Sequence, residues 1–173
     1  MVAKGLDFPE VTLVGVISAD TGFHMPDFRA AERTFQLLTQ VAGRSGRGGT
    51  PGEVVIQTRL PDEPILQAAA RQDFDAFSEA ELLERRAAGF PPFGRLVVFR
   101  WRGAAEATVT RVATEGSRHL SRSCRGGVAV LGPAPAPLAR LRGNYRWQSL
   151  LVGISGRDLR ATAAAVLNDL RAA

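Results

Sequence analysis

The strongest constraint on the fold is a strand, helix and strand pattern in the first third of the chain. Residues 11–18 (VTLVGVIS) form a continuous apolar, β-branched run, which predicts a buried strand of a parallel sheet. Residues 28–42 carry apolar side chains at helical spacing after Asp27, which can cap the helix. Residues 52–58 (GEVVIQT) predict a second strand. The pattern is one crossover unit of an α/β sheet.

The rest of the chain predicts a helical stretch and a second α/β part. Residues 61–92 are charged and helical in character, with a break near Gln72, and a Phe-Pro-Pro-Phe-Gly segment closes them. Residues 93–173 predict β-α-β-β-α, a small open α/β sandwich. Its predicted elements are a strand at 95–102, a helix at 104–123, a short strand at 127–131, a stiff proline-rich loop at 132–138, a strand at 145–152 and a helix from 158 onward. We therefore expect three parts, residues 1–60, a helical linker at 61–92 and residues 93–173.

Charge is distributed unevenly along the chain. Residues 1–89 hold 9 basic and 13 acidic side chains, whereas residues 90–173 hold 13 arginines and 4 acidic side chains. Coding bias can explain arginine in place of lysine, since Lys4 is the only lysine. It does not explain the shortage of acidic residues after residue 90. We expect the second half to contact a polyanion, and nucleic acid fits best.

Cysteine and histidine are too sparse to suggest a metal site. Cys124 is the only cysteine, and His24 and His119 are far apart in the sequence. We therefore predict no metal ligands, no multi-thiolate zinc site and no internal disulfide. No apolar run approaches the roughly 18 residues that a membrane span needs, so we expect no membrane partner and a cytoplasmic location.

The most specific motif lies at the end of the first predicted helix, in residues 40–47 (QVAGRSGR). Arg44 and Arg47 follow Gly43 and Gly46, so both arginines can point the same way from a turn. Guanidinium groups held in this way suit the spread charge of a transferring phosphoryl group. Arginines near a helix C-terminus also complement the helix dipole, and this motif alone does not decide between the two interpretations.

Several motifs together resemble one family of superfamily 2 helicases. Residues 40–47, in the form Q-x-x-G-R-x-G-R, are similar to helicase motif VI, and residues 4–11 (KGLDFPEV) are similar to motif V. Residues 19–40 (ADTGFHMPDFRAAERTFQLLTQ) are more specific and resemble the PriA family of primosomal DNA helicases. Further segments similar to that family are GFPPFGR at 89–95, LGPAPAPL at 131–138 and YRWQ at 145–148. The resemblance covers essentially the whole chain, in family order.

The resemblance implies the C-terminal part of an ATP-dependent 3′-to-5′ DNA helicase that restarts replication at stalled or repaired forks. Residues 1–60 would then be the end of a RecA-like second helicase lobe. Residues 93–173 would be a C-terminal domain that binds DNA and protein partners. By the same analogy, the nucleotide would face Gln40, Gly43 and Gly46.

Four further residues take roles from the resemblance. Arg47 would be the arginine finger that stabilises phosphoryl transfer, and Arg44 a second phosphate contact. Gly5 and Asp7 would couple nucleotide and DNA binding in motif V. Asp7 is equally consistent with a turn or helix-capping residue.

Two helicase features are missing from this sequence. It contains neither the phosphate-binding pattern G-x-x-x-x-G-K-[ST] nor the acidic motif that holds Mg²⁺. The resemblance implies ATP and Mg²⁺ in the full-length parent, and zinc on cysteines upstream of this chain. We expect none of these bound to this chain alone, and neither ATPase activity nor unwinding. The start inside motif V favours a fragment of a longer protein.

In this family the C-terminal domain contacts fork DNA and helps form a pocket for the acidic tail of single-stranded DNA-binding protein. Other primosome proteins are further expected partners. The matching residues are Asn144, Arg146, Trp147 and Gln148, and the family often has a basic residue where Asn144 stands. Strand alternation places Tyr145 with Trp147 on one face and Arg146 with Gln148 on the other. Arg146 and Trp147 offer a cation and a stacking surface for bases, although the two aromatic rings also suit core packing.

Three functions remain open from the sequence. The helicase fragment is the first, and a non-enzymatic adaptor for fork DNA and single-stranded DNA-binding protein, with a decayed helicase lobe, is the second. The intact set of Gln40, Arg44 and Arg47 argues against decay. Another superfamily 2 enzyme, such as a fork-reversal translocase, fits residues 19–29 and the C-terminal domain less well. Because residues 1–60 would hold only the end of a lobe, we also expect an exposed apolar edge around residues 11–17.

Overall fold

A computed structural model describes residues 11–23, 25–43 and 52–172. The chain divides into two compact units, Met1–Leu82 and Leu83–Ala173. The division falls inside one helix, α4 (Phe74–Ala88).

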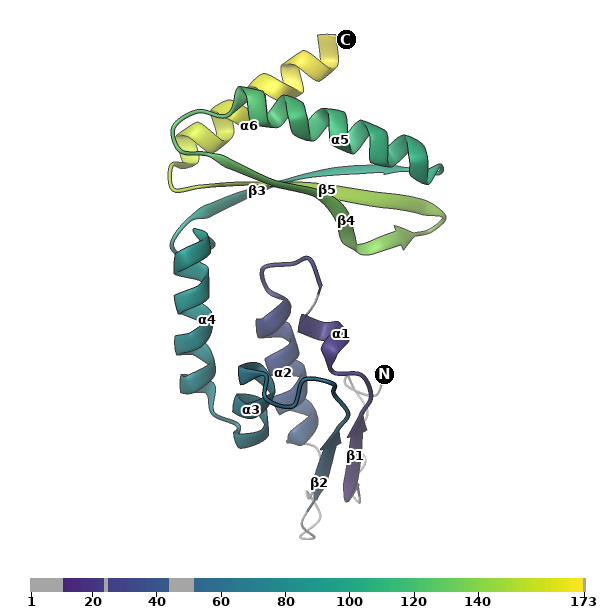
Figure 1. Ribbon diagram of the computed structural model, residues 1–173, viewed down its shortest axis with the longest axis vertical. Coiled ribbons are helices and arrows are strands. Elements are labelled where there is room, and N and C mark those ends of the chain that lie inside the picture. The colour runs from purple at the N-terminus through teal and green to yellow at the C-terminus, as the bar shows by residue number, and fades with distance from the viewer. Residues whose placement is uncertain (1–10, 24, 44–51, 173) are drawn as a thin grey trace. The chain divides into compact units, whose positions relative to one another are not determined.

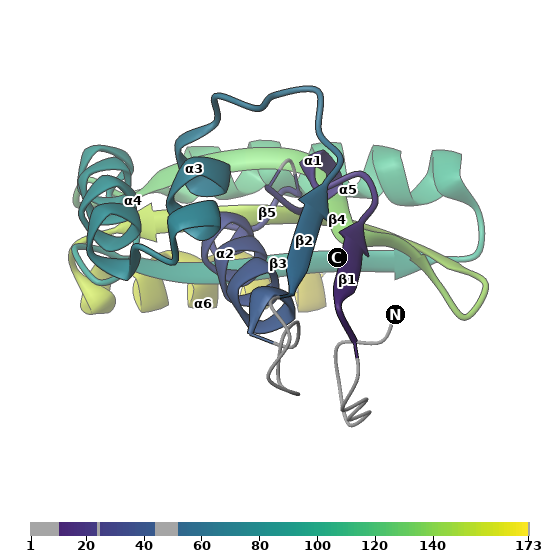
Figure 2. The ribbon, with the colours of Figure 1, turned by 90° about the horizontal axis from the view of Figure 1, so that it is seen from below.

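The first unit contains the predicted crossover. Strand β1 (Leu13–Val16) is followed by a single turn, α1 (Asp20–Phe23), by helix α2 (Ala30–Ala42) and by strand β2 (Glu53–Ile56). The two strands pair in parallel, from Leu13 opposite Glu53 to Val16 opposite Ile56. They lie side by side and point the same way, with α2 packed beside them (Figure 1; Figure 2). The prediction of a parallel α/β unit is confirmed.

The first unit has its core between α2 and the two helices that follow β2. These are α3 (Pro64–Arg71) and α4, and they meet α2 through Phe35, whose ring stacks on Phe77 with 4.2 Å between centroids. The predicted break between the helices is confirmed, because Gln72 has a left-handed backbone with φ of 54°. Asp73 then accepts a hydrogen bond from the backbone N–H of Ala76, which starts α4. The segment predicted as a linker therefore shares a core with α2.

Among the described residues, the parallel sheet is covered on one face only. Its inner side chains, such as Val16 and Ile56, pack against the core of the first unit. On the other face Leu13, Val55 and Ile17 are 60%, 51% and 83% exposed. Within the described part of the chain, the prediction of a fully buried strand is wrong, because only one layer of described helices covers the sheet. The predicted exposure of an apolar edge is confirmed.

The start of α2 differs from the prediction. The helix begins at Ala30, and Arg29 occupies the N-cap position without a side-chain capping bond. Asp27 instead accepts a hydrogen bond from the backbone N–H of Arg29 at 3.0 Å and pairs with Arg33 at 2.8 Å. Its carboxylate thus closes a turn before the helix rather than capping the first turn itself.

The second unit follows the predicted order β-α-β-β-α. Its elements are β3 (Arg95–Gly103), α5 (Glu106–Ser123), β4 (Ala129–Leu141), β5 (Asn144–Gly153) and α6 (Gly156–Ala172). The three strands form an antiparallel sheet in the order β3-β5-β4. Helices α5 and α6 lie together on one face of this sheet (Figure 1).

The core of the second unit lies between the sheet and its two helices. Leu120, Leu151 and Leu159 are among its fully buried side chains and come from α5, β5 and α6. One polar link crosses this core, a 2.8 Å hydrogen bond between the hydroxyls of Ser117 and Ser149. Both side chains are buried away from water, so each hydroxyl group supplies the hydrogen-bond partner that the other needs.

Strand β4 corrects the sequence prediction for residues 132–138. The proline-rich segment is not a loop but the middle of a long strand, interrupted by shifts in register. Proline lacks a backbone N–H, and β4 tolerates it because it is an edge strand of the sheet. At the end of β4 a two-residue turn, Arg142–Gly143, leads into β5, and both residues have positive φ, 50° and 79°.

Candidate nucleic-acid interface

The register between β3 and β5 decides which side chains share a face. Arg100 lies opposite Gln148, Trp101 opposite Trp147, and Arg102 opposite Arg146. Ser149 points to the helices, because it bonds Ser117 of α5. Strand alternation therefore puts Trp147 on the helix side of the sheet and both Arg146 and Gln148 on the other side.

Three arginines gather on the face of the sheet away from the helices. We call this set, Arg100, Arg102 and Arg146, the arginine face. Arg102 and Arg146 lie directly opposite one another on neighbouring strands, an arrangement that like charges disfavour. Arg100 donates a 3.4 Å hydrogen bond to the side-chain oxygen of the buried Gln148. In the described part of the chain, no carboxylate is paired with any of the three arginines.

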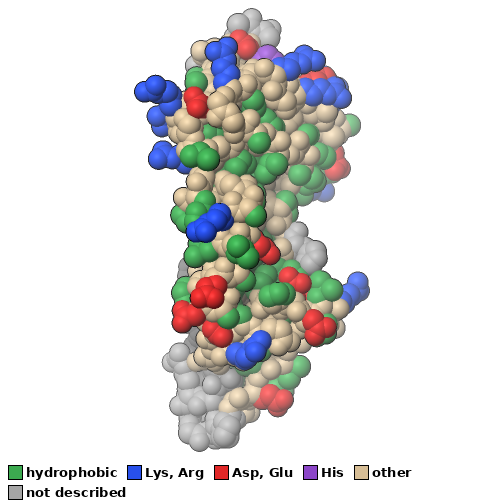
Figure 3. Space-filling model, turned by 60° about the vertical axis from the view of Figure 1, so that its left-hand side comes forward, with side chains coloured by type: hydrophobic (Ala, Val, Ile, Leu, Met, Phe, Trp, Pro, Cys, Tyr) green, Lys and Arg blue, Asp and Glu red, His purple; other side chains and the backbone are tan. Residues whose placement is uncertain are grey.

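The β4–β5 hairpin extends the positive surface. The guanidinium group of Arg140 lies over the ring of Tyr145, 5.1 Å from its centroid. Arg142 occupies the turn itself, where the side-chain amide of Asn144 donates a hydrogen bond to its backbone carbonyl at 3.3 Å. Basic side chains also lie elsewhere on the second unit, as Figure 3 shows for the face that comes forward from the left-hand side of Figure 1. This end of the sheet can therefore attract a polyanion.

The aromatic residues are divided between packing and partial exposure. Trp101 packs against the core of the second unit, and its indole lies directly against Gly116 of α5. Trp147, its cross-strand partner, is only half-buried, as is Tyr145. The structure thus confirms the predicted alternation, and it puts Trp147 and Arg146 on opposite faces. A ligand bound to one face of the sheet therefore cannot contact both Trp147 and Arg146.

Of the residues predicted to bind the nucleotide, the structure describes only Gln40 and Gly43. Gln40 is exposed in the last turn of α2, and Gly43 ends that helix with its N–H bonded to the carbonyl of Thr39 at 3.0 Å. The other predicted positions, Gly5, Asp7, Arg44, Gly46 and Arg47, lie outside the described residues. What the structure adds is the location of the C-terminal end of α2, which carries Gln40 and Gly43 and lies toward the edge where the parallel strands begin (Figure 1).

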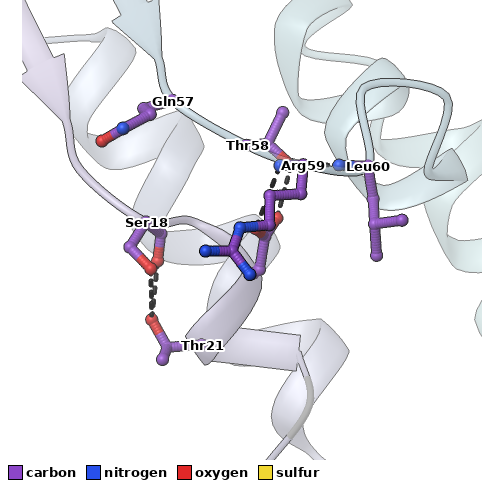
Figure 4. Close-up of a pocket in the computed structure, with 7 residues that line it drawn as sticks. Ser18, Thr21, Gln57, Thr58, Arg59 and Leu60 are labelled. Carbon is purple, nitrogen blue, oxygen red and sulfur yellow. Dashed lines mark hydrogen bonds between the residues drawn. The ribbon is translucent and has the colours of Figure 1, made fainter.

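A separate cleft of about 600 Å³ opens at the opposite edge, where the parallel strands end. Asp20 organises it by accepting hydrogen bonds from the hydroxyl of Thr58 and, at 3.0 Å, from the backbone N–H of Arg59. Thr21 donates a 2.6 Å hydrogen bond to the carbonyl of Ser18 on the other wall (Figure 4). Ligands of open α/β sheets bind at this edge. Sequence reasoning missed the cleft, although polar residues after each predicted strand were its signal.

The comparisons with known proteins agree on one family. A family model described as "Primosomal protein N C-terminal domain" matches residues 86–173. The chain is 46% identical over 153 residues to the replication restart protein PriA of Bacillus subtilis (strain 168), which covers 87% of this chain and 19% of that protein. It is 43% identical over 172 residues to the replication restart protein PriA of Treponema pallidum (strain Nichols), which covers 99% of this chain and 26% of that protein. The chain belongs to the PriA family.

Within that family the chain is the C-terminal portion of PriA, and it spans about a fifth to a quarter of the length of these relatives. The matched PriA domain contains all of the arginine face and the β4–β5 hairpin. Sequence reasoning identified Arg146 but missed Arg100 and Arg102. Their spacing of two residues in a predicted strand was the available signal, since it puts both on one face.

The described residues contain neither a cluster of metal-ligating side chains nor a membrane-spanning helix. Within them, no group of three or more His, Cys, Asp or Glu side chains could hold a metal ion. No helix in these same residues is long and apolar enough to cross a membrane. Burial raises the pKa of the Cys124 thiol, whose Sγ donates to the carbonyl of Leu120 at 3.2 Å.

Proposed function

We propose that this chain serves replication restart as the DNA-binding C-terminal portion of a PriA protein, and that the arginine face contacts the DNA backbone. The observation that carries the proposal is the direct opposition of Arg102 and Arg146 on neighbouring strands. An anionic phosphate between the two guanidinium groups would replace their repulsion with two charge-assisted hydrogen bonds. The name of the relatives, replication restart protein, supports the process, and the excess of arginine over acidic residues supports the ligand.

Salt-dependent DNA binding tests this proposal. Each phosphate neutralised on single-stranded DNA contributes about −0.7 to the slope of log affinity against log salt, so one phosphate on Arg102 and Arg146 and a second on Arg100 predict a slope near −1.4. Changing Arg102→Gln or Arg146→Gln is expected to weaken binding of a fluorescent oligonucleotide, and changing both is expected to reduce the magnitude of that slope by about 0.7 in total, because the two arginines share one phosphate.

Arg111→Gln is the matched control, because Arg111 is exposed on α5 and already pairs with Glu115 at 3.3 Å. It is expected to leave both affinity and slope nearly unchanged. Equal losses for all three variants would mean that only net charge matters, and the proposal for the arginine face would be abandoned.

A second candidate function concerns the longer protein. The Q-x-x-G-R-x-G-R sequence of residues 40–47 supports a role in ATP-dependent helicase activity, with Arg47 as arginine finger and Arg44 as a second phosphate contact. The first unit would then be the end of a RecA-like lobe, and preceding residues of the parent would cover the exposed face of β1 and β2. The adaptor function, with single-stranded DNA-binding protein and primosome proteins as partners, is the alternative that needs no catalysis.

Substitution in a full-length PriA protein that carries this C-terminal portion separates the helicase and adaptor functions. Arg47→Ala is expected to lower the rate of DNA-stimulated ATP hydrolysis by about 10³-fold or more, while DNA affinity is retained. Unchanged hydrolysis would reject the arginine-finger role and favour the adaptor. This chain by itself is expected to hydrolyse no ATP.

A further inference from the structure

A small cavity lies at the end of the edge strand β3, between that strand and α5 on the helix side of the sheet. Its volume is about 190 Å³, and its lining includes Trp101, Arg102, Thr108, Val109 and Val112. Pockets for whole drug-sized ligands are larger, about 300–1,000 Å³. This cavity therefore suits a single planar ring rather than a complete nucleotide or an extended peptide.

The cavity results from the way α5 packs on β3, the other edge strand of the sheet. Thr108, Val112 and Gly116 follow one another at four-residue spacing, so they lie along one face of that helix. At Gly116 a Cβ atom would lie only 2.7 Å from the indole ring of Trp101. Glycine thus lets the indole approach the helix backbone, and Thr108 and Val112 border the space beside it.

The lining combines an aromatic ring, apolar side chains and one cation. None of its residues carries a carboxylate. An indole offers a stacking surface to any base, since every base has a π-face. Arg102 also lines the cavity, and its side chain belongs to the arginine face on the other side of the sheet from Trp101. Because β3 is an edge strand, DNA that passes this edge can place a base beside Trp101 and a phosphate on Arg102.

We infer that this cavity receives one unpaired base of bound DNA, stacked near Trp101, with the neighbouring phosphate on Arg102 at the edge of the sheet. The inference rests on the proposed DNA binding and adds a site for a base to it. It predicts a preference for DNA that offers an unpaired base, because a base within a duplex is not free to enter. An apolar side chain of a protein partner is the competing occupant.

Fluorescence of Trp101 tests the inference directly. The chain has 2 tryptophans, so Trp147→Phe leaves Trp101 as the only indole emitter. Titration with oligothymidylate is expected to quench this emission in a saturable way. An abasic oligonucleotide of the same length is expected to bind through its phosphates with little quenching.

A blocking substitution supplies the second measurement. Val112 is 38% exposed, so Val112→Phe can fill the cavity from its rim without disturbing the core. Because a base–aromatic stack contributes strongly to affinity, we expect about a 5- to 150-fold loss for oligothymidylate and none for the abasic oligonucleotide. Leu167→Phe is the control, since Leu167 on α6 is 45% exposed and away from the cavity lining.

The outcomes separate this inference from the proposed function. If oligothymidylate binds with the expected salt slope but neither quenches Trp101 nor responds to Val112→Phe, the base site is rejected and the arginine face stands. If neither oligonucleotide binds, the proposed function fails first. If an acidic peptide with apolar side chains quenches Trp101 while oligothymidylate does not, the cavity belongs to a protein partner and the inference is overturned.

Discussion

Removing one of the two opposed arginines is expected to stabilise the second unit while weakening its function. In the apo protein Arg102 and Arg146 face one another across β3 and β5, without a paired carboxylate among the described residues. Arg102→Gln removes one charge and keeps most of the side-chain stem. The free energy of unfolding should therefore rise, although DNA affinity falls.

The size of the stability gain follows from the geometry. Directly opposite residues of an antiparallel pair have Cβ atoms about 4.5–5.5 Å apart, and like charges there cost up to about 1 kcal/mol. Two unit charges about 5 Å apart in water repel by about 0.8 kcal/mol, and long side chains can splay to reduce this. We therefore expect a gain of about 0.5 kcal/mol, which corresponds to an increase of about 0.2–0.5 M in the urea midpoint.

Tryptophan fluorescence in urea measures this gain selectively, because both tryptophans, Trp101 and Trp147, lie in the second unit. The gain should disappear in about 1 M salt, where the screening length falls to about 3 Å. Arg111→Gln, which removes a residue that pairs with Glu115, should show no gain. A midpoint for Arg102→Gln below that of the unchanged protein at low salt would refute the electrostatic argument.

Two sets of substitutions and one labelling experiment probe the second unit further. Ser117→Ala should lower the free energy of unfolding by about 1–3 kcal/mol, because Ser149 then lacks its buried partner, and the double change with Ser149→Ala should recover most of the loss in urea denaturation. Gly116→Val should destabilise the unit by at least about 1–3 kcal/mol and shift the emission of Trp101, since the indole must move. Burial raises the pKa of the Cys124 thiol. At pH 8 Cys124 should therefore react with a thiol reagent more slowly than an exposed cysteine does, and the pH at which its rate reaches half of the maximum should be higher.

Local patterns predicted most elements of this fold correctly. Apolar periodicity located both helices that cover the antiparallel sheet, and the sequence at Gln72 located the break between α3 and α4. The proline-rich part of β4 was missed because a proline run normally signals a loop. Only the position of β4 at the edge of the sheet, which depends on strand order, makes that run compatible with a strand.

The candidate sites depended on contacts that sequence patterns do not contain. Arg102 and Arg146 are far apart in the chain, and only the register of β3 against β5 makes them neighbours. The cleft at Asp20 has the same origin, since Thr58 reaches that carboxylate only because β1 and β2 are adjacent. Alternation within one strand was predictable, whereas the pairing of one strand with another was not.

The arginine face is better explained by a ligand than by folding. A strand that only had to pack would be more stable with β-branched or uncharged side chains at these positions, since opposed like charges weaken a sheet. Neither Arg102 nor Arg146 belongs to the core cluster of the second unit. A local arrangement that opposes stability, within a unit whose other elements agree with its fold, is expected at a functional site. The same two guanidinium groups that repel each other in the free protein can share one phosphate, so the structural cost and the proposed DNA contact have one cause.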